Sequence, residues 1–302
     1  MRGRCLDGRK VALVGGDRRQ DYLAAILGEQ GAECWLVRRR PPGPAGVRHS
    51  VDLREGVSGA SLVVLPMPPF GPDFKLWSED PEDSIRFPPE LLVLLSRPAV
   101  VLAGSFPSDF AREADRLGCA AVPLGDLDEL AVLNSVPTAE GAVLLALERS
   151  TVTIHGSRAA VLGYGRTGQT LASTLRALGG RVVVVARRPE ARARAVAAGC
   201  EAARFEELAD AVAGARFVFN TVPAPVLGEE ILSRLGPCTV VVDLASAPGG
   251  TDFEAARRLG IEAVLAPSLP GRVAPETAAG YLAGVVLRVA AERLEPEAVV
   301  EG

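Results

Sequence analysis

The sequence predicts an α/β protein with two Rossmann-like, doubly wound parallel-sheet domains that flank a cleft. The 302 residues correspond to about two domains, and 48% of them are hydrophobic, which is enough for buried cores. Short apolar runs alternate with segments of helical periodicity along most of the chain, as in parallel sheets whose two faces are covered by helices. A glycine-rich turn at 163–168 also lies between a buried strand and a helix, which is typical of a nucleotide-binding domain.

The first domain is expected to span residues 1–135 and to bind substrate. Its predicted strands are the apolar runs at 11–14, 33–37, 61–65, 99–103 and 120–123. Its predicted helices are 22–29, 89–95 and 107–117. The long proline-rich stretch 66–89 is typical of a lid or a binding loop, with a disordered surface loop as the alternative.

A connecting helix at 136–152 and a nucleotide-binding domain at 153–272 are expected to follow. Between the domains, two helices are predicted at 126–133 and 137–148, separated by Asn134-Ser135-Val136. The predicted strands of the second domain are 159–162, 181–186, 202–205, 217–222, 239–244 and 261–266. The last segment, 273–302, contains an apolar helix at 276–294 that we expect to pack across the domain junction.

The glycine-rich turn follows the strand at 159–162 and opens the next helix. Gly163 permits a tight turn, Gly165 lets the backbone approach a diphosphate, and Gly168 lets the helix pack closely on the strand. Free N–H groups at the helix N-terminus favour a phosphate there. An ordinary strand-to-helix turn is the alternative, but the flanking strands and helix favour a dinucleotide site. We therefore expect a cofactor to be bound by Gly163, Tyr164, Gly165, Arg166, Thr167 and Gly168.

The end of the second strand indicates which dinucleotide is bound. An NAD site usually has an acidic residue about 20 residues after the glycines, where it binds the ribose 2′-hydroxyl. Here the strand ends in Arg187 and Arg188, and no carboxylate is present. Two guanidinium groups suit a 2′-phosphate, which they can bind bidentately, although both arginines also fit a solvated helix start. The sequence therefore predicts NADP, with NAD as the alternative.

Polar residues follow the ends of several predicted strands, which is the edge at which doubly wound sheets bind ligands. In the second domain these are the cofactor candidates Asn220, Thr221, Val222, Pro223 and Asp243, together with the substrate candidate Ser268. In the first domain, Arg18 follows a strand and offers a cation to a carboxylate. Residues that only form turns after the strands are the alternative for any one of these clusters. That alternative explains all of the clusters together less well.

Composition and charge narrow the range of partners. The net charge of −4 gives no reason to expect nucleic acid or an anionic membrane. No stretch approaches the roughly 20 apolar residues of a membrane span, and the apolar run near the N-terminus is too short for a signal peptide, so we expect a soluble cytoplasmic protein. Five scattered cysteines without a C-x-x-C pair fit a reducing compartment. With only two histidines, we expect no metal site.

Six motifs, spread in order from about residue 10 to residue 287, resemble those of the dipicolinate synthase A subunit family. They are GGDRRQDYL, NSVPTAEGA, LGYGRTGQTLA, FNTVPAPVL, DLASAPGGTDF and APSLPGRVAPETA, with small departures at Tyr164 and Ser268. The resemblance implies an NADP-dependent enzyme in the mother cell of a sporulating bacterium. Such an enzyme makes pyridine-2,6-dicarboxylate from a dihydrodipicolinate-type intermediate of the lysine pathway. It also implies a flavoprotein-like partner, the B subunit, and we expect homo-oligomers as well.

The implied reaction removes a hydride and a proton from a dihydropyridine ring, and aromatisation drives the loss of the proton. The protein then has to align the donor carbon and bind the two carboxylates of a small substrate. We expect this substrate to contact Arg18, Asn134, Ser135, Thr138 and Ser268, with Glu140 as a proton acceptor.

Two other functions fit the same fold. One is a 2-hydroxyacid or amino-acid dehydrogenase, which normally places a histidine near the nicotinamide. The last histidine here, His155, precedes the nucleotide strand, so we expect it to be structural. The other is a nucleotide-binding regulatory protein without catalysis of its own, since a fold does not by itself imply chemistry.

Overall fold

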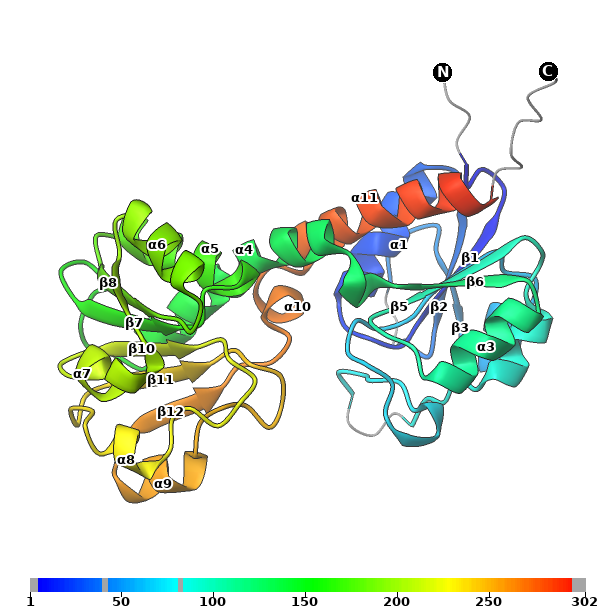
Figure 1. The fold of residues 1–302 in the computed structure, drawn as a ribbon. Coiled ribbons are helices and arrows are strands. Elements are labelled where there is room, and N and C mark those ends of the chain that lie inside the picture. The colour runs from blue at the N-terminus through cyan, green and yellow to red at the C-terminus, as the bar shows by residue number, and fades with distance from the viewer. Residues whose placement is uncertain (1–4, 40–42, 81–83, 295–302) are drawn as a thin grey trace. The chain divides into compact units, whose positions relative to one another are not determined.

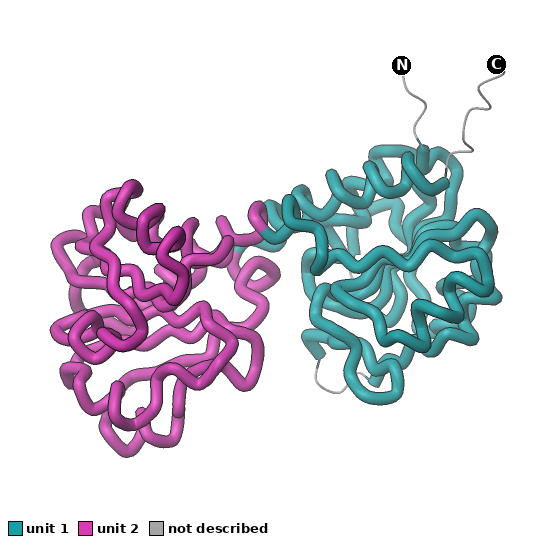
Figure 2. Tube along the Cα trace, in the orientation of Figure 1, with its two compact units in different colours: residues 1–131, 274–302 teal, residues 132–273 magenta. Residues whose placement is uncertain are grey.

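The computed structural model describes residues 5–39, 43–80 and 84–294, and the chain divides into two units (Figure 2). The first unit comprises residues 1–131 and 274–302, and the second comprises residues 132–273. Each unit has a six-stranded sheet with helices on both faces (Figure 1). The predicted α/β class with two doubly wound sheets is thereby confirmed.

The sheet of the first unit has the strand order β3-β2-β1-β4-β5-β6, and all neighbouring strands are parallel. Its strands and helices are β1 (Lys10–Val14), α1 (Arg19–Glu29), β2 (Glu33–Val37), β3 (Arg48–Ser50), α2 (Leu53–Val57), β4 (Leu62–Val64), β5 (Ala99–Ala103), α3 (Ser108–Arg116), β6 (Cys119–Pro123) and α11 (Pro275–Leu294). Along β1, Val11 and Leu13 join one hydrophobic cluster and Ala12 and Val14 another, so both faces of the sheet are buried. The strand order reverses between β1 and β4.

Two short elements, β3 and α2, lie where the sequence predicted none. β3 is an edge strand of three residues, and its sequence Arg48-His49-Ser50 has no apolar pattern to mark it. It pairs with β2 through the backbone. α2 begins after Asp52, whose carboxylate accepts hydrogen bonds from the N–H groups of Arg54 (2.7 Å) and Glu55 (3.1 Å).

The stretch 66–89, expected to be a lid or a loop, is docked on the first unit where the structure describes it. Leu76, Ile85 and Phe87 are buried in the same cluster as Val14 and Val101. The N–H of Leu76 donates to the carbonyl of Ile85 (2.8 Å). Only residues 81–83 lie outside the described part of this stretch. The helix predicted at 89–95 is a 3-10 helix, η2 (Pro89–Leu94).

The long helix α11 belongs to the first unit. It packs against α1 and β5, and Ala279, Ala283, Val286 and Ala290 are buried in the same cluster as Leu23. Small residues along this stripe allow α11 and α1 to approach closely. The expected helix at 276–294 is confirmed, and within the first unit it packs against α1 and β5.

The sheet of the second unit is also fully parallel and has the order β12-β11-β10-β7-β8-β9. Its strands and helices are β7 (Arg158–Leu162), α5 (Arg166–Ala177), β8 (Arg181–Val185), α6 (Pro189–Ala197), β9 (Glu201–Ala203), α7 (Leu208–Val212), β10 (Phe217–Asn220), α8 (Glu229–Leu232), β11 (Val240–Asp243), α9 (Phe253–Arg258), β12 (Glu262–Leu265) and α10 (Leu269–Val273). Each predicted strand of this domain is present. The helix α10 was not predicted, because the prolines around it are typical of turns.

The two helices expected around Asn134 are a single helix, α4 (Asp128–Glu148), with Pro137 inside it. The prediction of a break there was wrong. The hydroxyls of Ser135 and Thr138 donate to the carbonyls of Val132 (2.6 Å) and Asn134 (2.7 Å), so both side chains bond to the backbone of the same helix. By length and composition α4 is also apolar enough to cross a membrane, but half of its most apolar window is buried in the protein. A core helix of a soluble protein has the same properties.

Candidate functional site

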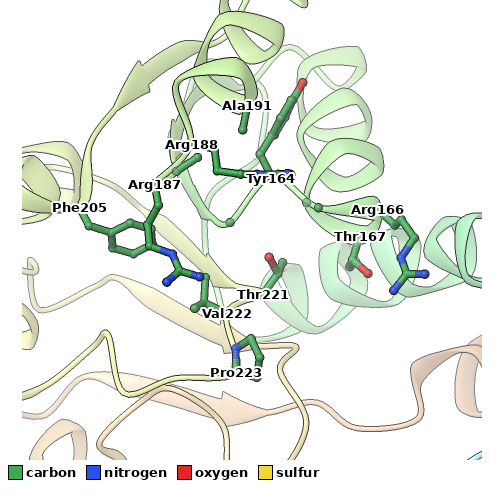
Figure 3. Close-up of a pocket in the computed structure, with 14 residues that line it drawn as sticks. Tyr164, Arg166, Thr167, Arg187, Arg188, Ala191, Phe205, Thr221, Val222 and Pro223 are labelled. Carbon is green, nitrogen blue, oxygen red and sulfur yellow. The ribbon is translucent and has the colours of Figure 1, made fainter. Parts of the chain in front are cut away.

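A cavity of about 590 Å³ opens at the carboxyl end of β7 in the second unit (Figure 3). Its volume falls in the range of small-molecule and cofactor sites, roughly 300–1,000 Å³. Its walls come from the glycine turn, the end of β8, α6 and the segment after β10. The lining residues are Gly163, Tyr164, Gly165, Arg166, Thr167, Gly168, Ala186, Arg187, Arg188, Ala191, Phe205, Thr221, Val222 and Pro223. Eleven of these were predicted, since only Ala186, Ala191 and Phe205 were not among the cofactor candidates.

The three glycines of the turn differ in what surrounds them. Gly163 has a φ of +92°, and a Cβ there would overlap the hydroxyl of Thr221. A Cβ at Gly168 would overlap the carbonyl oxygen of Gly163, so this glycine permits close packing of α5. In contrast, a Cβ at Gly165 would have no atom within 4 Å. Gly165 therefore leaves open space at the cavity rather than room for packing.

The N-terminus of α5 faces this cavity. The helix has 12 residues and begins after Gly165, with no acidic residue in its first turn. Its first N–H groups have no partner within the helix, and the positive end of the helix dipole lies there. Thr221 fixes the turn from the neighbouring strand, because its hydroxyl donates to the carbonyl of Leu162 (2.8 Å). The site can therefore hold a diphosphate through backbone N–H groups.

Arginines surround the end of the cavity beyond β8. Arg187 and Arg188 are exposed, line the cavity, and form no ion pair with any residue that the structure describes. A second hollow, of about 520 Å³, shares Arg187 and Phe205 with the first and adds Arg192 and Arg204. In Figure 3 the side chain of Arg187 lies beside the ring of Phe205. Arg192, Arg204 and Phe205 were not predicted, and only the position of β9 beside β8 brings the last two to this edge.

Asn220 and Asp243 do not line the cavity, although both were cofactor candidates. They are fully buried, and the amide of Asn220 donates to the Asp243 carboxylate (3.0 Å). That carboxylate also accepts hydrogen bonds from the N–H of Ala245 (3.0 Å), the N–H of Gly250 (2.8 Å) and the hydroxyl of Thr251 (2.7 Å). Both side chains thus hold the loop after β11 in place.

Tyr164 forms part of the cavity wall and is itself only 7% exposed. Its ring belongs to the hydrophobic cluster that also contains Leu171 and Ala191. Burial raises the pKa of the Tyr164 phenol above its ordinary value. Tyr164 therefore contributes an apolar, neutral surface to the site.

The predicted substrate residues on α4 differ in what their side chains contact. The Ser135 hydroxyl lies 2.5 Å from that of Thr170 on α5, so it joins α4 to the helix of the glycine turn. The Oδ1 atom of Asn134 is enclosed and has no hydrogen-bond partner among the described residues. Glu140 is exposed, and Ser268, with a φ of +56°, precedes α10.

In the first unit, Arg18 is exposed and donates weakly to the hydroxyl of Tyr22 (3.5 Å). Its neighbour Arg19, which was not a candidate, is buried and paired with Asp17. Among the residues that the structure describes, no group of three or more His, Cys, Asp or Glu side chains could hold a metal ion.

Two family models match the chain. The N-terminal domain of the dipicolinate synthase A subunit matches residues 10–124. The NAD binding domain of D-isomer specific 2-hydroxyacid dehydrogenases matches residues 139–247, which include the whole glycine turn and its cavity. The second unit is thus a nicotinamide dinucleotide-binding domain of the dehydrogenase type, and the chain has an oxidoreductase-type architecture.

The similarity extends over nearly the whole chain. The dipicolinate synthase A subunit of Bacillus subtilis is 36% identical over 293 residues, which cover 95% of this chain and 97% of the relative. The crystal structure of the dipicolinate synthase A subunit from Bacillus halodurans superposes with a TM-score of 0.83 at 33% identity, covering 96% of this chain and 99% of that one. The crystal structure of the corresponding Bacillus subtilis protein gives a TM-score of 0.81 at 35% identity, covering 95% and 97%. On this identity and coverage, the chain belongs to the dipicolinate synthase A subunit family.

Proposed function

We propose that this chain oxidises a dihydrodipicolinate-type intermediate of the lysine pathway to pyridine-2,6-dicarboxylate, with NADP as the hydride acceptor. The observation that supports this most is the cavity at the glycine turn, with its two exposed arginines, in a chain that shares 36% identity over 95% of its length with a dipicolinate synthase A subunit. We also propose a cytoplasmic location in the mother cell during sporulation, partnership with the B subunit, and self-association.

The proposed reaction balances without an external base or further oxidant. A C–H bond of the dihydropyridine breaks as its electron pair leaves with the hydrogen, a ring proton goes to solvent or a carboxylate, and the ring becomes aromatic. The nicotinamide, when bound, supplies the acceptor for that hydride. The residues of the chain bind and orient the cofactor. The N-terminus of α5 binds the diphosphate, and Tyr164 and Val222 provide neutral and apolar walls of the site.

The choice of NADP over NAD rests on the end of β8. Arg187 and Arg188 lie where an NAD site places a carboxylate, and no acidic residue is among the described residues that line this cavity. Glu206 lines the neighbouring hollow, but Arg187, Arg192 and Arg204 line the same space and outnumber it. An anionic 2′-phosphate therefore suits this edge better than a neutral hydroxyl.

On the substrate side, we propose Asn134 and Glu140 as the α4 residues that contact the substrate. The Oδ1 atom of Asn134 is an unused acceptor, and Glu140 is exposed with no ion pair among the residues described. Ser135 and Thr138 bond to the α4 backbone and instead position this part of the helix. Ser268 remains a candidate through the conformation of its turn.

The test is a reaction of the purified full-length chain with NADP and the product of dihydrodipicolinate synthase, with and without the B subunit. We expect NADPH absorbance and the ultraviolet absorbance of the pyridine diacid to rise together. Activity that requires the B subunit while this chain only binds NADP would favour the regulatory alternative. Absence of both products in every mixture would refute the proposal.

A 2-hydroxyacid dehydrogenase is the second candidate, because the NAD binding domain of that family matches residues 139–247. His155 lies before β7, at the opposite end of the strand from the cavity, and is exposed. No other histidine occurs in the second unit. The same assay with 2-hydroxy acids and amino acids in place of the dihydropyridine distinguishes this candidate.

A further inference from the structure

We propose that Arg19, in the first turn of α1, binds a carboxylate of the substrate. The site lies in the first unit, at the carboxyl end of β1, and its ligand class is a small dicarboxylate. This inference rests on the proposed function for the identity of the substrate. It moves the carboxylate contact from Arg18, which the sequence favoured, to its buried neighbour.

The guanidinium of Arg19 is held in one orientation by Asp17. Its Nε donates to Asp17 Oδ1 (2.8 Å) and its Nη2 donates to Asp17 Oδ2 (2.7 Å). The backbone N–H of Arg19 also donates to Asp17 Oδ1 (3.0 Å). The two side chains are only 10% and 6% exposed. Little side-chain entropy remains to be lost when a ligand binds to an arginine that is fixed in this way.

Asp17 does not use the opposite edge of the same guanidinium, which is formed by Nη1 and the second N–H of Nη2. Nη1 of Arg19 forms no hydrogen bond with any residue that the structure describes. It is also not fully enclosed by the protein. Nη1 therefore reaches solvent. Because the planar guanidinium has five N–H donors, the edge formed by Nη1 and the second N–H of Nη2 can still bind a carboxylate with two parallel hydrogen bonds.

Gln20 provides a second, independent sign that this end of β1 is built for a polar ligand. Gln20 is 4% exposed, and its Nε2 donates to the carbonyl of Val64 (3.3 Å), which fixes the orientation of the amide. Its Oε1 is enclosed and has no partner in the described part of the chain. Gln20 and Arg19 line the same small cavity, whose volume of about 10 Å³ has room for about one water. A water there can donate to Gln20 Oε1 and connect it to a ligand held by Arg19.

The position of Arg19 in the sheet also fits a ligand site. β1 lies between β2 and β4, where the strand order reverses, and open parallel sheets bind ligands beyond the strand ends at that point. Gly15 and Gly16 have φ values of +58° and +79°, which allow the sharp turn from β1 into α1.

Two other arginines near this turn are less suited to the task. Arg39 is already paired with Asp21 (2.6 Å) and Glu79 (2.7 Å), so its charge is compensated twice. Arg18 is exposed, and exposed ion pairs contribute little because both partners stay solvated. Arg19 alone among the three combines burial, a fixed orientation and an N–H edge that no described residue uses.

The experiment compares binding of pyridine-2,6-dicarboxylate and pyridine-2-carboxylate to the full-length chain by calorimetry. In the wild type we expect the diacid to bind about ten- to a hundredfold more tightly, the range of one charge-assisted bidentate contact. Arg19→Lys keeps a cation beside Asp17 but loses the second N–H edge, so this preference should disappear. NADP affinity should not change, whereas a general loss of structure would lower the affinity for NADP as well. Arg18→Ala is the matched variant next to it and should retain the preference.

A second variant covers the case in which Arg19→Lys does not fold. The pair Asp17→Asn and Arg19→Gln removes both buried charges together, so neither is left alone. A preference for the diacid that survives in either variant, or one that is lost in Arg18→Ala instead, would overturn the assignment. No preference in the wild type would overturn it as well. In turnover assays, a wild-type-like KM in Arg19→Lys refutes the Arg19 site alone, whereas an inactive wild type refutes the proposed function.

Discussion

Replacing Gly165 by valine should weaken dinucleotide binding while leaving the free protein stable. The Cβ of a larger residue there would have no atom within 4 Å, and the backbone φ of −80° and ψ of −164° suit valine. The side chain would therefore project into the cavity, where a diphosphate has to approach. Overlap in a rigid site costs about 1–3 kcal/mol, or about five- to 150-fold in affinity. The melting temperature of the free protein should fall by less than about 2 °C, as for an exposed substitution.

Gly168→Val is the matched control in the same turn. A Cβ at Gly168 would overlap the carbonyl oxygen of Gly163, which is backbone and cannot move aside cheaply. This substitution should cost about 1–3 kcal/mol of stability, which lowers the melting temperature by roughly 2–12 °C. Scanning fluorimetry of both variants, with and without NADP, measures the two effects. A Gly165 variant that melts as low as the Gly168 variant, or that binds NADP normally, would refute the separate roles of the two glycines.

Three further substitutions or reagents test other parts of the account. Arg187→Asp should weaken NADP binding about ten- to a hundredfold and NAD binding far less, and equal losses in a fluorescence titration would show that Arg187 does not contact the 2′-phosphate. Asp243→Ala should destabilise the chain by about 3 kcal/mol in urea unfolding, because it leaves four buried donors without an acceptor, and a wild-type midpoint would contradict that role. Iodoacetamide at pH 8 should label the exposed Cys238 but not Cys34, since burial raises the pKa of the Cys34 thiol to about 12 and keeps it protonated; labelling of folded Cys34 would contradict this.

The sequence predicted the parts of the fold that local chemistry determines. Continuous apolar runs such as 182–185 indicate strands buried on both faces, and they are found in that state. The glycine turn was recognised because its three glycines meet steric demands that follow from strand, turn and helix alone. All six residues of that turn, 163–168, line the cavity.

Other features depend on contacts between distant segments, which the sequence pattern does not show. Asn220 and Asp243 were expected to face the cofactor because they end strands, but pairing of β10 with β11 turns them toward each other. Arg204 reaches the cavity edge only through the place of β9 beside β8. Pro137 indicated a helix start by its residue type, yet α4 continues through it. Arg19 is buried and Arg18 is exposed, a difference between adjacent arginines that the sequence does not show.

The most direct test of the proposed function is the stoichiometry of products from one reaction. The full-length chain, supplied with NADP, the product of dihydrodipicolinate synthase and the B subunit, should form one NADPH for each pyridine-2,6-dicarboxylate. At limiting NADP, Gly165→Val should form less of both products together, because we propose that the hydride acceptor binds at the glycine turn. Diacid formed without NADPH, or formed equally well by the Gly165 variant, would contradict the account, since the oxidation would then not use this site.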